Sequence, residues 1–249
     1  MSGHSKWSTI KRKKGAKDTA RGKIFTRLIR EITIAARTGG DQESNPRLRT
    51  AVSAAKSANM PSDNISRAIK KGTGEIAGVV IEEIVYEGYG PLGVAVLAET
   101  ATDNRNRTAS ALRHIFSKHG GNLGAVGSVT WMFDQKGVVV VERDRVDEET
   151  LIEAALEAGA EDVSSELDDQ FQIITAPGDL HVVASELEKI GIPIVEAGLD
   201  RLPKNTKTLN EKEAEKFLKF YEMIEDQDDV QRVFANFEIS DEVMEKLGN

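Results

Sequence analysis

GVVVVERDRVDEETLIEAALEAGAEDVSSELDDQFQIITAPGDLHVVASELEKIGIPIVEAGLDRL, residues 137–202, alternates strand and helix patterns in an order that predicts a complete small domain. Runs rich in Val and Ile predict strands, and apolar residues at helical spacing predict helices. The expected elements are strand Gly137–Val141, helix Glu148–Ala158, strand Asp162–Glu166, strand Phe171–Thr175, helix Asp179–Ile190 and strand Ile194–Leu202. This βαββαβ order is that of the ferredoxin-like arrangement, in which two split βαβ units share one antiparallel sheet.

The segments on either side of this unit predict a second α/β domain. The expected elements are strands Val79–Tyr86 and Val94–Thr100, helix Asn106–His119, strand Ser128–Phe133, helix Glu211–Ile224 and strand Val233–Glu238. The last helix and strand have no sheet of their own, so we expect them to return to the sheet of residues 79–133. The ferredoxin-like domain, residues 136–204, is then an insertion in a discontinuous middle domain of residues 76–135 and 205–249.

Residues 1–75 predict a separate basic helical domain with a flexible N-terminal arm. Each expected helix has a capping residue or a proline at its start, and a glycine or asparagine close to its end. The three helices are residues 18–37, 46–59 and 62–72. The chain is therefore expected to be a mixed α+β protein of three domains, one helical and two α/β.

Charge is divided unevenly along the chain. The net charge is -8, yet residues 1–71 hold 17 Lys or Arg against 5 Asp or Glu, and residues 72–249 hold 16 against 36. Such asymmetry indicates that one end meets a polyanion while the acidic remainder keeps the protein soluble and discourages indiscriminate binding.

The composition excludes several kinds of protein. The chain has no cysteine, which rules out disulfides, thiolate zinc sites and cysteine nucleophiles. No stretch approaches the roughly 20 apolar residues of a membrane helix, and no apolar core follows the basic N-terminus as it would in a signal peptide. We expect a cytoplasmic protein that does not contact a membrane.

The densest basic segment is the N-terminus together with one face of the first helix. Lysine and arginine there can neutralise phosphates and release counterions without reading any base, and Trp7 can stack on an unpaired base. The alternative is a solvated basic arm with Trp7 buried against a domain. The expected nucleic-acid contacts are Lys6, Trp7, Lys11, Arg12, Lys13, Lys14, Lys17, Arg21, Lys23, Arg27 and Arg30.

A second candidate patch lies where a strand meets the helix that begins near Asn106. Asn104, Arg105 and Arg107 can hold a phosphate there with help from free backbone amides, and Arg113 extends the patch two turns further on. The alternative is an ordinary capped helix start whose arginines form surface ion pairs.

The signals for catalysis are weak. Glu149, Glu153 and Glu157 share one helix face, as solvated carboxylates usually do. His114 and His119 are five residues apart, so they point in different directions on a helix and form no metal site. Neither the phosphate-loop spacing nor a serine nucleophile elbow is present. We therefore expect no enzyme, no cofactor and no metal.

Several motifs resemble those of the YebC family. They are Gly3-His4-Ser5-Lys6-Trp7, Ile10-Lys11-Arg12-Lys13-Lys14, Asn59-Met60-Pro61, Asp63-Asn64-Ile65, Arg67-Ala68-Ile69, Tyr86-Glu87-Gly88-Tyr89-Gly90-Pro91 with Gly93, and Thr102-Asp103-Asn104-Arg105-Asn106-Arg107-Thr108. The resemblance implies three domains with a helical N-terminal domain, and a regulator rather than a catalyst. It also carries over the basic N-terminal positions, with His4 among them, as nucleic-acid contacts.

Two functions remain open at this level. Family members are commonly classed as DNA-binding transcriptional regulators, while others, including the mitochondrial activator of cytochrome oxidase translation, are described as ribosome-associated translation factors. The same basic domain could hold DNA, ribosomal RNA or transfer RNA, with the transcription machinery or the ribosome as a further partner. Few aromatic residues and no helix-turn-helix pattern favour RNA or shape recognition, whereas the family's usual classification favours DNA.

Overall fold

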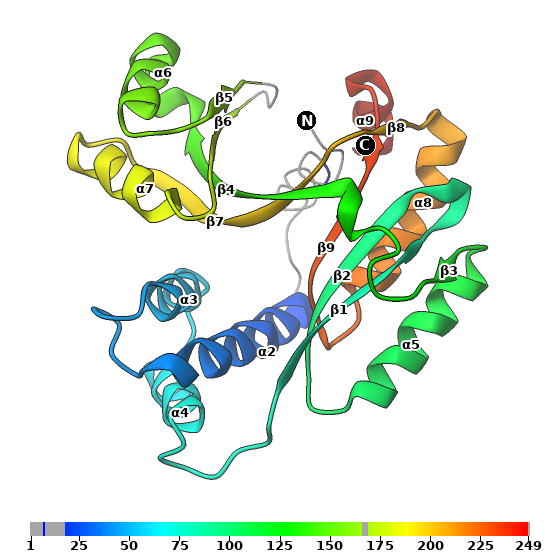
Figure 1. Ribbon diagram of the computed structural model, residues 1–249, viewed down its shortest axis with the longest axis horizontal. Coiled ribbons are helices and arrows are strands. Elements are labelled where there is room, and N and C mark those ends of the chain that lie inside the picture. The colour runs from blue at the N-terminus through cyan, green and yellow to red at the C-terminus, as the bar shows by residue number, and fades with distance from the viewer. Residues whose placement is uncertain (1–6, 8–17, 166–168, 249) are drawn as a thin grey trace.

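The computed structural model describes residue 7, residues 18–165 and residues 169–248. Three units are arranged around a central region in Figure 1: a group of N-terminal helices, an antiparallel sheet with its helices, and a second four-stranded sheet with two helices of its own. This is the mixed α+β architecture of three domains that the sequence predicts.

The N-terminal unit consists of α2 (Asp18–Ala35), α3 (Pro46–Ser57) and α4 (Ser62–Gly72), with a 3₁₀ turn after α2 at Ala36–Thr38. Its core is a small-residue cluster in which Ile32 and Leu48 are fully buried. Asn45 caps α3 by accepting the amide of Leu48 at 3.1 Å, as predicted. Gly72 ends α4 where it crosses α2, and a Cβ there would collide with the carbonyl oxygen of Thr33.

The middle unit is an antiparallel sheet covered on one face by helices. Its strands are β1 (Glu82–Tyr89), β2 (Ala95–Thr102), the two-residue β3 (Asn122–Leu123) and β9 (Val230–Ala235), in the order β3-β1-β2-β9. The covering helices are α5 (Arg105–Lys118), α8 (Glu211–Glu225) and the C-terminal α9 (Asp241–Gly248). They bury an aromatic cluster in which Phe116 and Phe220 meet edge to face at 5.0 Å.

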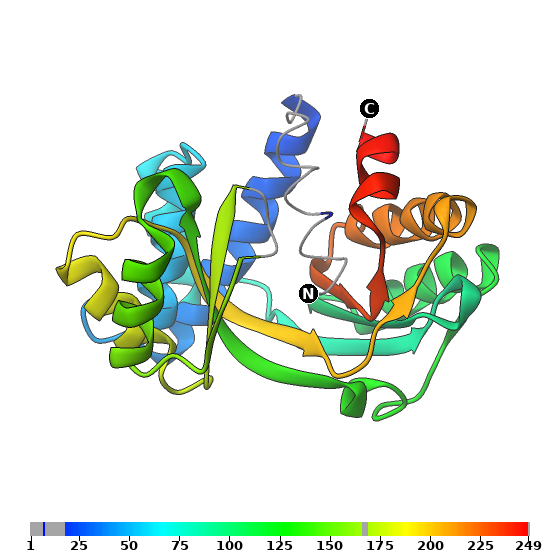
Figure 2. The same cartoon turned by 90° about the horizontal axis from the view of Figure 1, so that it is seen from above.

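The third unit is the predicted ferredoxin-like insertion. It runs β4 (Phe133–Glu142), α6 (Glu148–Glu157), β5 (Asp162–Ser164), β6 (Gln170–Thr175), α7 (Leu180–Lys189) and β7 (Ile194–Pro203). The sheet order β5-β6-β4-β7 is that of two split βαβ units. Figure 2 shows β4 and β7 running as a long pair from this unit to the middle sheet. Beyond it, β8 (Lys207–Thr208) pairs with β10 (Phe237–Glu238).

Two strand predictions are wrong in position. The strand expected at 79–86 begins at Glu82, and Val79 and Val80 are 68% and 73% exposed. The strand expected at 233–238 is two strands, because Asn236 leaves the ladder and its Oδ1 accepts the amide of Ala95 at 2.7 Å. The domain division expected between residues 135 and 136 falls inside β4, Phe133–Glu142. The exact domain boundaries stay a prediction.

The strand expected at 128–133 is instead a loop that ends in a 3₁₀ turn, Thr130–Met132. Buried Glu87 explains the difference, because its carboxylate accepts the backbone N–H groups of Gly127, Val129 and Thr130 at 2.8–3.0 Å. Burial acts to raise the pKa of Glu87, but these hydrogen bonds outweigh it and lower the pKa. The amides that a strand would use are bound to this side chain.

Candidate nucleic-acid interface

The described residues contain only part of the predicted N-terminal surface. His4, Lys6, Lys11, Arg12, Lys13, Lys14 and Lys17 lie outside them, and Arg21 lies in α2 with its side chain outside the described part. Their role stays a prediction. Trp7, Lys23, Arg27 and Arg30 can be placed.

Trp7 lies in the core of the middle unit. Its side chain is 8% exposed and belongs to the cluster that contains Val94 and Phe217. The indole Nε1 is buried and has no hydrogen-bond partner among the described residues. The structure therefore corresponds to the alternative in which Trp7 is buried against a domain, and base stacking would require the indole to leave this position.

The cationic face of α2, which the sequence predicts to contact nucleic acid, packs against the end of α8. Lys23 Nζ lies 3.2 Å from the carbonyl oxygen of Asp226 and 3.5 Å from its carboxylate. Arg27 donates to the carbonyl oxygen of Glu225, and Arg30 donates to that of Asp228. Carbonyl groups at a helix C-terminus carry partial negative charge, so these side chains cap α8 electrostatically.

Arg27 is incompletely satisfied in this position. Its Nε is buried without a hydrogen-bond partner in the described part of the chain. Burial lowers the pKa of the guanidinium, and the nearby Glu225, Asp226 and Asp228 offset only part of that effect. The present partners of Arg27 therefore compensate only part of the desolvation of its guanidinium.

Asp229 joins α2, α5 and the α8–β9 turn at one carboxylate that is 9% exposed. Arg30 reaches it at 2.9 Å, Arg107 at 2.8 Å, and the Thr108 hydroxyl donates to it at 2.7 Å. Burial acts to raise the pKa of Asp229, but the hydrogen bonds from Thr108 and Arg107 and the charges of Arg30 and Arg107 hold it below its ordinary value.

The second predicted patch is divided by this contact. Asn104 caps α5 by accepting the amide of Arg107 at 3.0 Å, and Arg107 is bound to both Asp229 and Asp103. That is the capped helix start with ion pairs that the sequence left open as an alternative. Arg105 and Arg113 are exposed and form no ion pair with any residue of the described ranges.

Sequence reasoning missed the acidic turn that binds α2. Residues 225–229 read EDQDD, four carboxylates within five positions directly after a predicted helix. A charge run is usually solvated, so only its opposite sign to the N-terminal helix could have suggested a contact. Its separation of about 200 residues from α2 hides that pairing from any local pattern.

No group of three or more His, Asp or Glu in the described residues could hold a metal ion, and Glu149 and Glu153 line an open acidic surface on α6. No helix in residues 18–165 or 169–248 is long and apolar enough to cross a bilayer.

The fold and the charged surfaces define a three-domain, mixed α+β protein with a basic helical N-terminal domain and an inserted ferredoxin-like unit. Two family models match it: the TACO1/YebC protein N-terminal domain over residues 5–75, and the TACO1/YebC second and third domain over residues 81–237. The chain belongs to the TACO1/YebC family.

Similar proteins match this chain over nearly its whole length. A probable transcriptional regulatory protein of Syntrophus aciditrophicus is 60% identical over 99% of both chains, and one of Geobacter sulfurreducens is 57% identical over 99% of this chain and all of that one. The crystal structure of a conserved hypothetical protein from Aquifex aeolicus has a TM-score of 0.83 and 51% identity, covering 90% of this chain and 93% of that chain.

Proposed function

We propose that the protein is a cytoplasmic, non-enzymatic regulator of gene expression that binds DNA through its phosphate backbone. The observation that carries the proposal is the charge division, 17 basic against 5 acidic residues in positions 1–71 of a chain with net charge -8. A basic domain attached to acidic domains fits a polyanion partner. The names of the relatives support transcription as the process.

The basic N-terminal positions supply the main contact in this proposal, and the α2 cations add to it after release from α8. Lys23, Arg27 and Arg30 now bind the turn 225–229, so a phosphate backbone must compete with that turn for them. Binding then favours separation of α2 from the end of α8. The unpartnered Arg27 Nε supports this exchange, because a phosphate oxygen can accept from it.

The test is a binding titration with Lys11, Arg12, Lys13 and Lys14 all changed to Glu. We expect the variant to lose binding to a DNA duplex and to lose the salt dependence of binding. The matched control changes the exposed Lys212, Lys216, Lys219 and Lys246 to Glu, which alters net charge equally. Equal losses in the two variants would reduce the effect to net charge and refute a contact by the arm.

Competition by the acidic turn has its own test. Changing Asp226 and Asp228 to Asn removes two charges beside α2, and we expect severalfold tighter DNA binding. The control changes Glu148 and Glu149 on α6 to Gln, with the same change in net charge. No difference between the two pairs would show that the turn does not compete.

RNA is the second candidate target. The cationic face of α2 packs on the end of α8, so in this position it does not present a recognition helix to a DNA groove. Crosslinking in cells, with DNA and RNA recovered together, separates the two. Arm-dependent enrichment of promoter DNA supports the proposal, whereas enrichment of ribosomal or transfer RNA without promoters moves the function to translation.

A further inference from the structure

Helix α5 (Arg105–Lys118) carries basic side chains and no acidic ones, although its domain is acidic as a whole. Its sequence, RNRTASALRHIFSK, contains three arginines, one lysine and one histidine, and no Asp or Glu. The neighbouring α8, EKEAEKFLKFYEMIE, mixes lysine with many glutamates, which is the usual composition of a solvated helix. Solubility alone does not require a helix without carboxylates.

One face of α5 packs and the opposite face is open. Thr108, Leu112, Ile115 and Phe116 are buried against the sheet and α8. At about 100° per residue, Asn106, Ser110, Arg113 and Ser117 fall within an arc of about 60° on the other side, and all four are exposed. Exposed His114 and Lys118 flank this stripe on one side, whereas exposed Arg105, in the first turn, lies at the angle of the packed residues Leu112 and Phe116.

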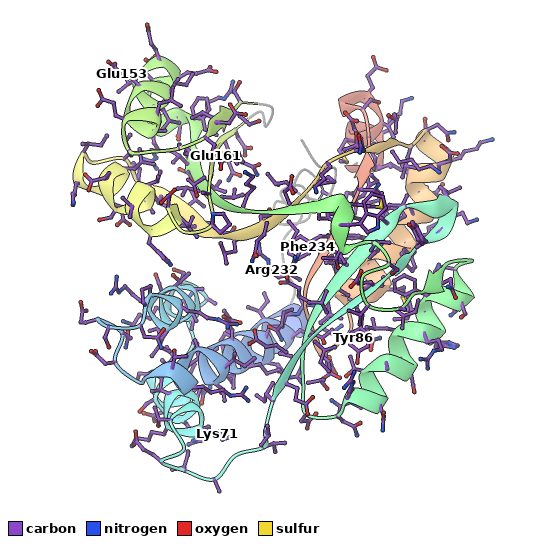
Figure 3. All side chains as sticks on the ribbon, viewed as in Figure 1. Lys71, Tyr86, Glu153, Glu161, Arg232 and Phe234 are labelled. Carbon is purple, nitrogen blue, oxygen red and sulfur yellow. The ribbon has the colours of Figure 1, made fainter. Side chains whose placement is uncertain are left out.

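The cations of this face are not neutralised within the described protein. Arg107 is held by Asp229 and Asp103, whereas Arg105, Arg113 and Lys118 have no carboxylate partner among residues 18–165 and 169–248. Figure 3 shows Tyr86 beside the start of α5, where its hydroxyl donates to the Arg105 carbonyl at 3.1 Å and fixes the backbone. The face is therefore positioned on a rigid element and carries uncompensated charge.

The α5 face adjoins α2. Arg30 of α2 and Arg107 of α5 bind the same carboxylate, that of Asp229, so side chains of the two helices reach a common point. Helix α5 is about 20 Å long at 1.5 Å per residue, which matches about six phosphates of one duplex strand at 3.4 Å each along the axis. A single nucleic acid can lie against both elements.

We propose that the α5 face, defined as Asn106, Ser110, Arg113, His114, Ser117 and Lys118, is a second phosphate-contact surface for the DNA duplex held by the N-terminal domain. Arg113 and Lys118 bind phosphates, and the short amide and hydroxyl side chains between them donate to backbone oxygens and allow close approach. The inference rests on the proposed function and extends it to a second, separate element.

The test variant combines Arg113→Gln and Lys118→Gln on α5. The matched control combines Lys212→Gln and Lys216→Gln on α8. Both variants lose two positive charges from exposed helix positions, and glutamine keeps the helix. Affinity for a 30-base-pair DNA duplex and for an RNA hairpin is measured between 50 and 200 mM salt. Circular dichroism melting checks that both variants fold.

We expect the α5 variant alone to lower the slope of log affinity against log salt, by about 0.9 for each lost contact. For two contacts, the wild-type affinity for DNA then falls about tenfold more than that of the α5 variant over this salt range. Equal slopes for the α5 and α8 variants, with wild-type binding intact and dependent on the arm, would overturn the α5 surface and leave the proposed function standing. An effect with RNA only would overturn DNA as the occupant, and no binding by the wild-type chain would overturn both proposals.

Discussion

Replacing Asp229 by Asn tests whether one carboxylate joins three elements. The carboxylate is 9% exposed and is contacted by Arg30, Arg107 and Thr108 at 2.7–2.9 Å. Asparagine keeps the size and one acceptor oxygen for the Thr108 hydroxyl, but it removes the charge. The substitution therefore isolates the electrostatic part of the contact.

The magnitude follows from the exposure of the two arginines. Removing one partner of a buried ion pair costs about 3–5 kcal/mol, because the other charge stays buried. Arg107 is 50% exposed and keeps Asp103 at 2.7 Å, so its share is only about 0–1 kcal/mol. Arg30 is 17% exposed and carries most of the cost. We expect the free energy of unfolding at pH 7 to fall by about 2–3 kcal/mol.

Urea denaturation followed by circular dichroism measures this change, with Asp226→Asn in the same turn as the control. Asp226 is 61% exposed, so its replacement should stay within about 0.5 kcal/mol of the wild type. A loss for Asp229→Asn as small as that of the control would refute the role of the carboxylate as a junction.

The pH dependence provides a second readout. The pKa of Asp229 is lowered in the folded protein, so its ionised form stabilises the fold above the ordinary aspartate pKa. That contribution is lost as pH falls through the lowered pKa, where both states are protonated. The difference in stability between wild type and Asp229→Asn should therefore be full near neutral pH and shrink in strong acid. A difference that does not change with pH would contradict the mechanism.

Three further substitutions test local features. Asn45→Ala removes the cap on the Leu48 amide and should lower the free energy of thermal unfolding by about 1–2 kcal/mol; no change would show that water replaces the cap. Glu87→Gln should lower the opening free energy of the loop amides that Glu87 binds by roughly 1.5–3 kcal/mol and so speed their hydrogen exchange. Unchanged exchange would contradict the role of Glu87. Gly72→Ala places a methyl group against the Thr33 carbonyl and should lower the free energy of unfolding by about 1–3 kcal/mol. A melting temperature equal to that of the wild type would show that α2 and α4 move apart to accommodate the methyl group.

Local chemistry made much of the fold predictable. The start of α3 follows from an asparagine cap before a proline, and the end of α4 follows from a glycine. The ferredoxin-like order follows from alternating periodicity over 66 residues, positions 137–202. Each of these signals lies within a few positions of the element that it defines.

The errors occur where a distant side chain takes the backbone groups. Glu87 binds amides 40 or more positions away, and Asn236 binds the amide of Ala95 across 141 positions. Arg232 makes another contact that local sequence does not show, because it donates to the carbonyl oxygen of Leu199, 33 positions away. Its guanidinium also lies over the ring of Phe234 on the same strand (Figure 3). Hydrophobic periodicity identifies the face of a strand or helix and not the group that meets it.

The same distinction bears on the candidate interface. Periodicity correctly separated the cations of α2 from its packing residues, but it could not show that the turn 225–229 covers them. Trp7 likewise carries no local signal for burial in a core formed by residues 94–244. Opposite charge sign was the feature of the sequence that could have suggested the contact of α2 with the turn, because the basic N-terminal helix and the acidic turn attract each other.

The sharing of Asp229 makes release of α2 less costly than loss of the carboxylate itself. When α2 separates from α8, Arg107 and Thr108 continue to bind Asp229, so no buried charge is left without a partner. In the proposed binding, Arg30 would move from a partly buried ion pair to a phosphate, and Arg27 would gain an acceptor for a buried Nε that has none in the described protein. The turn holds the α2 cations in the structure, and the proposal requires that a polyanion of higher charge density displace it while Asp229 keeps two of its partners.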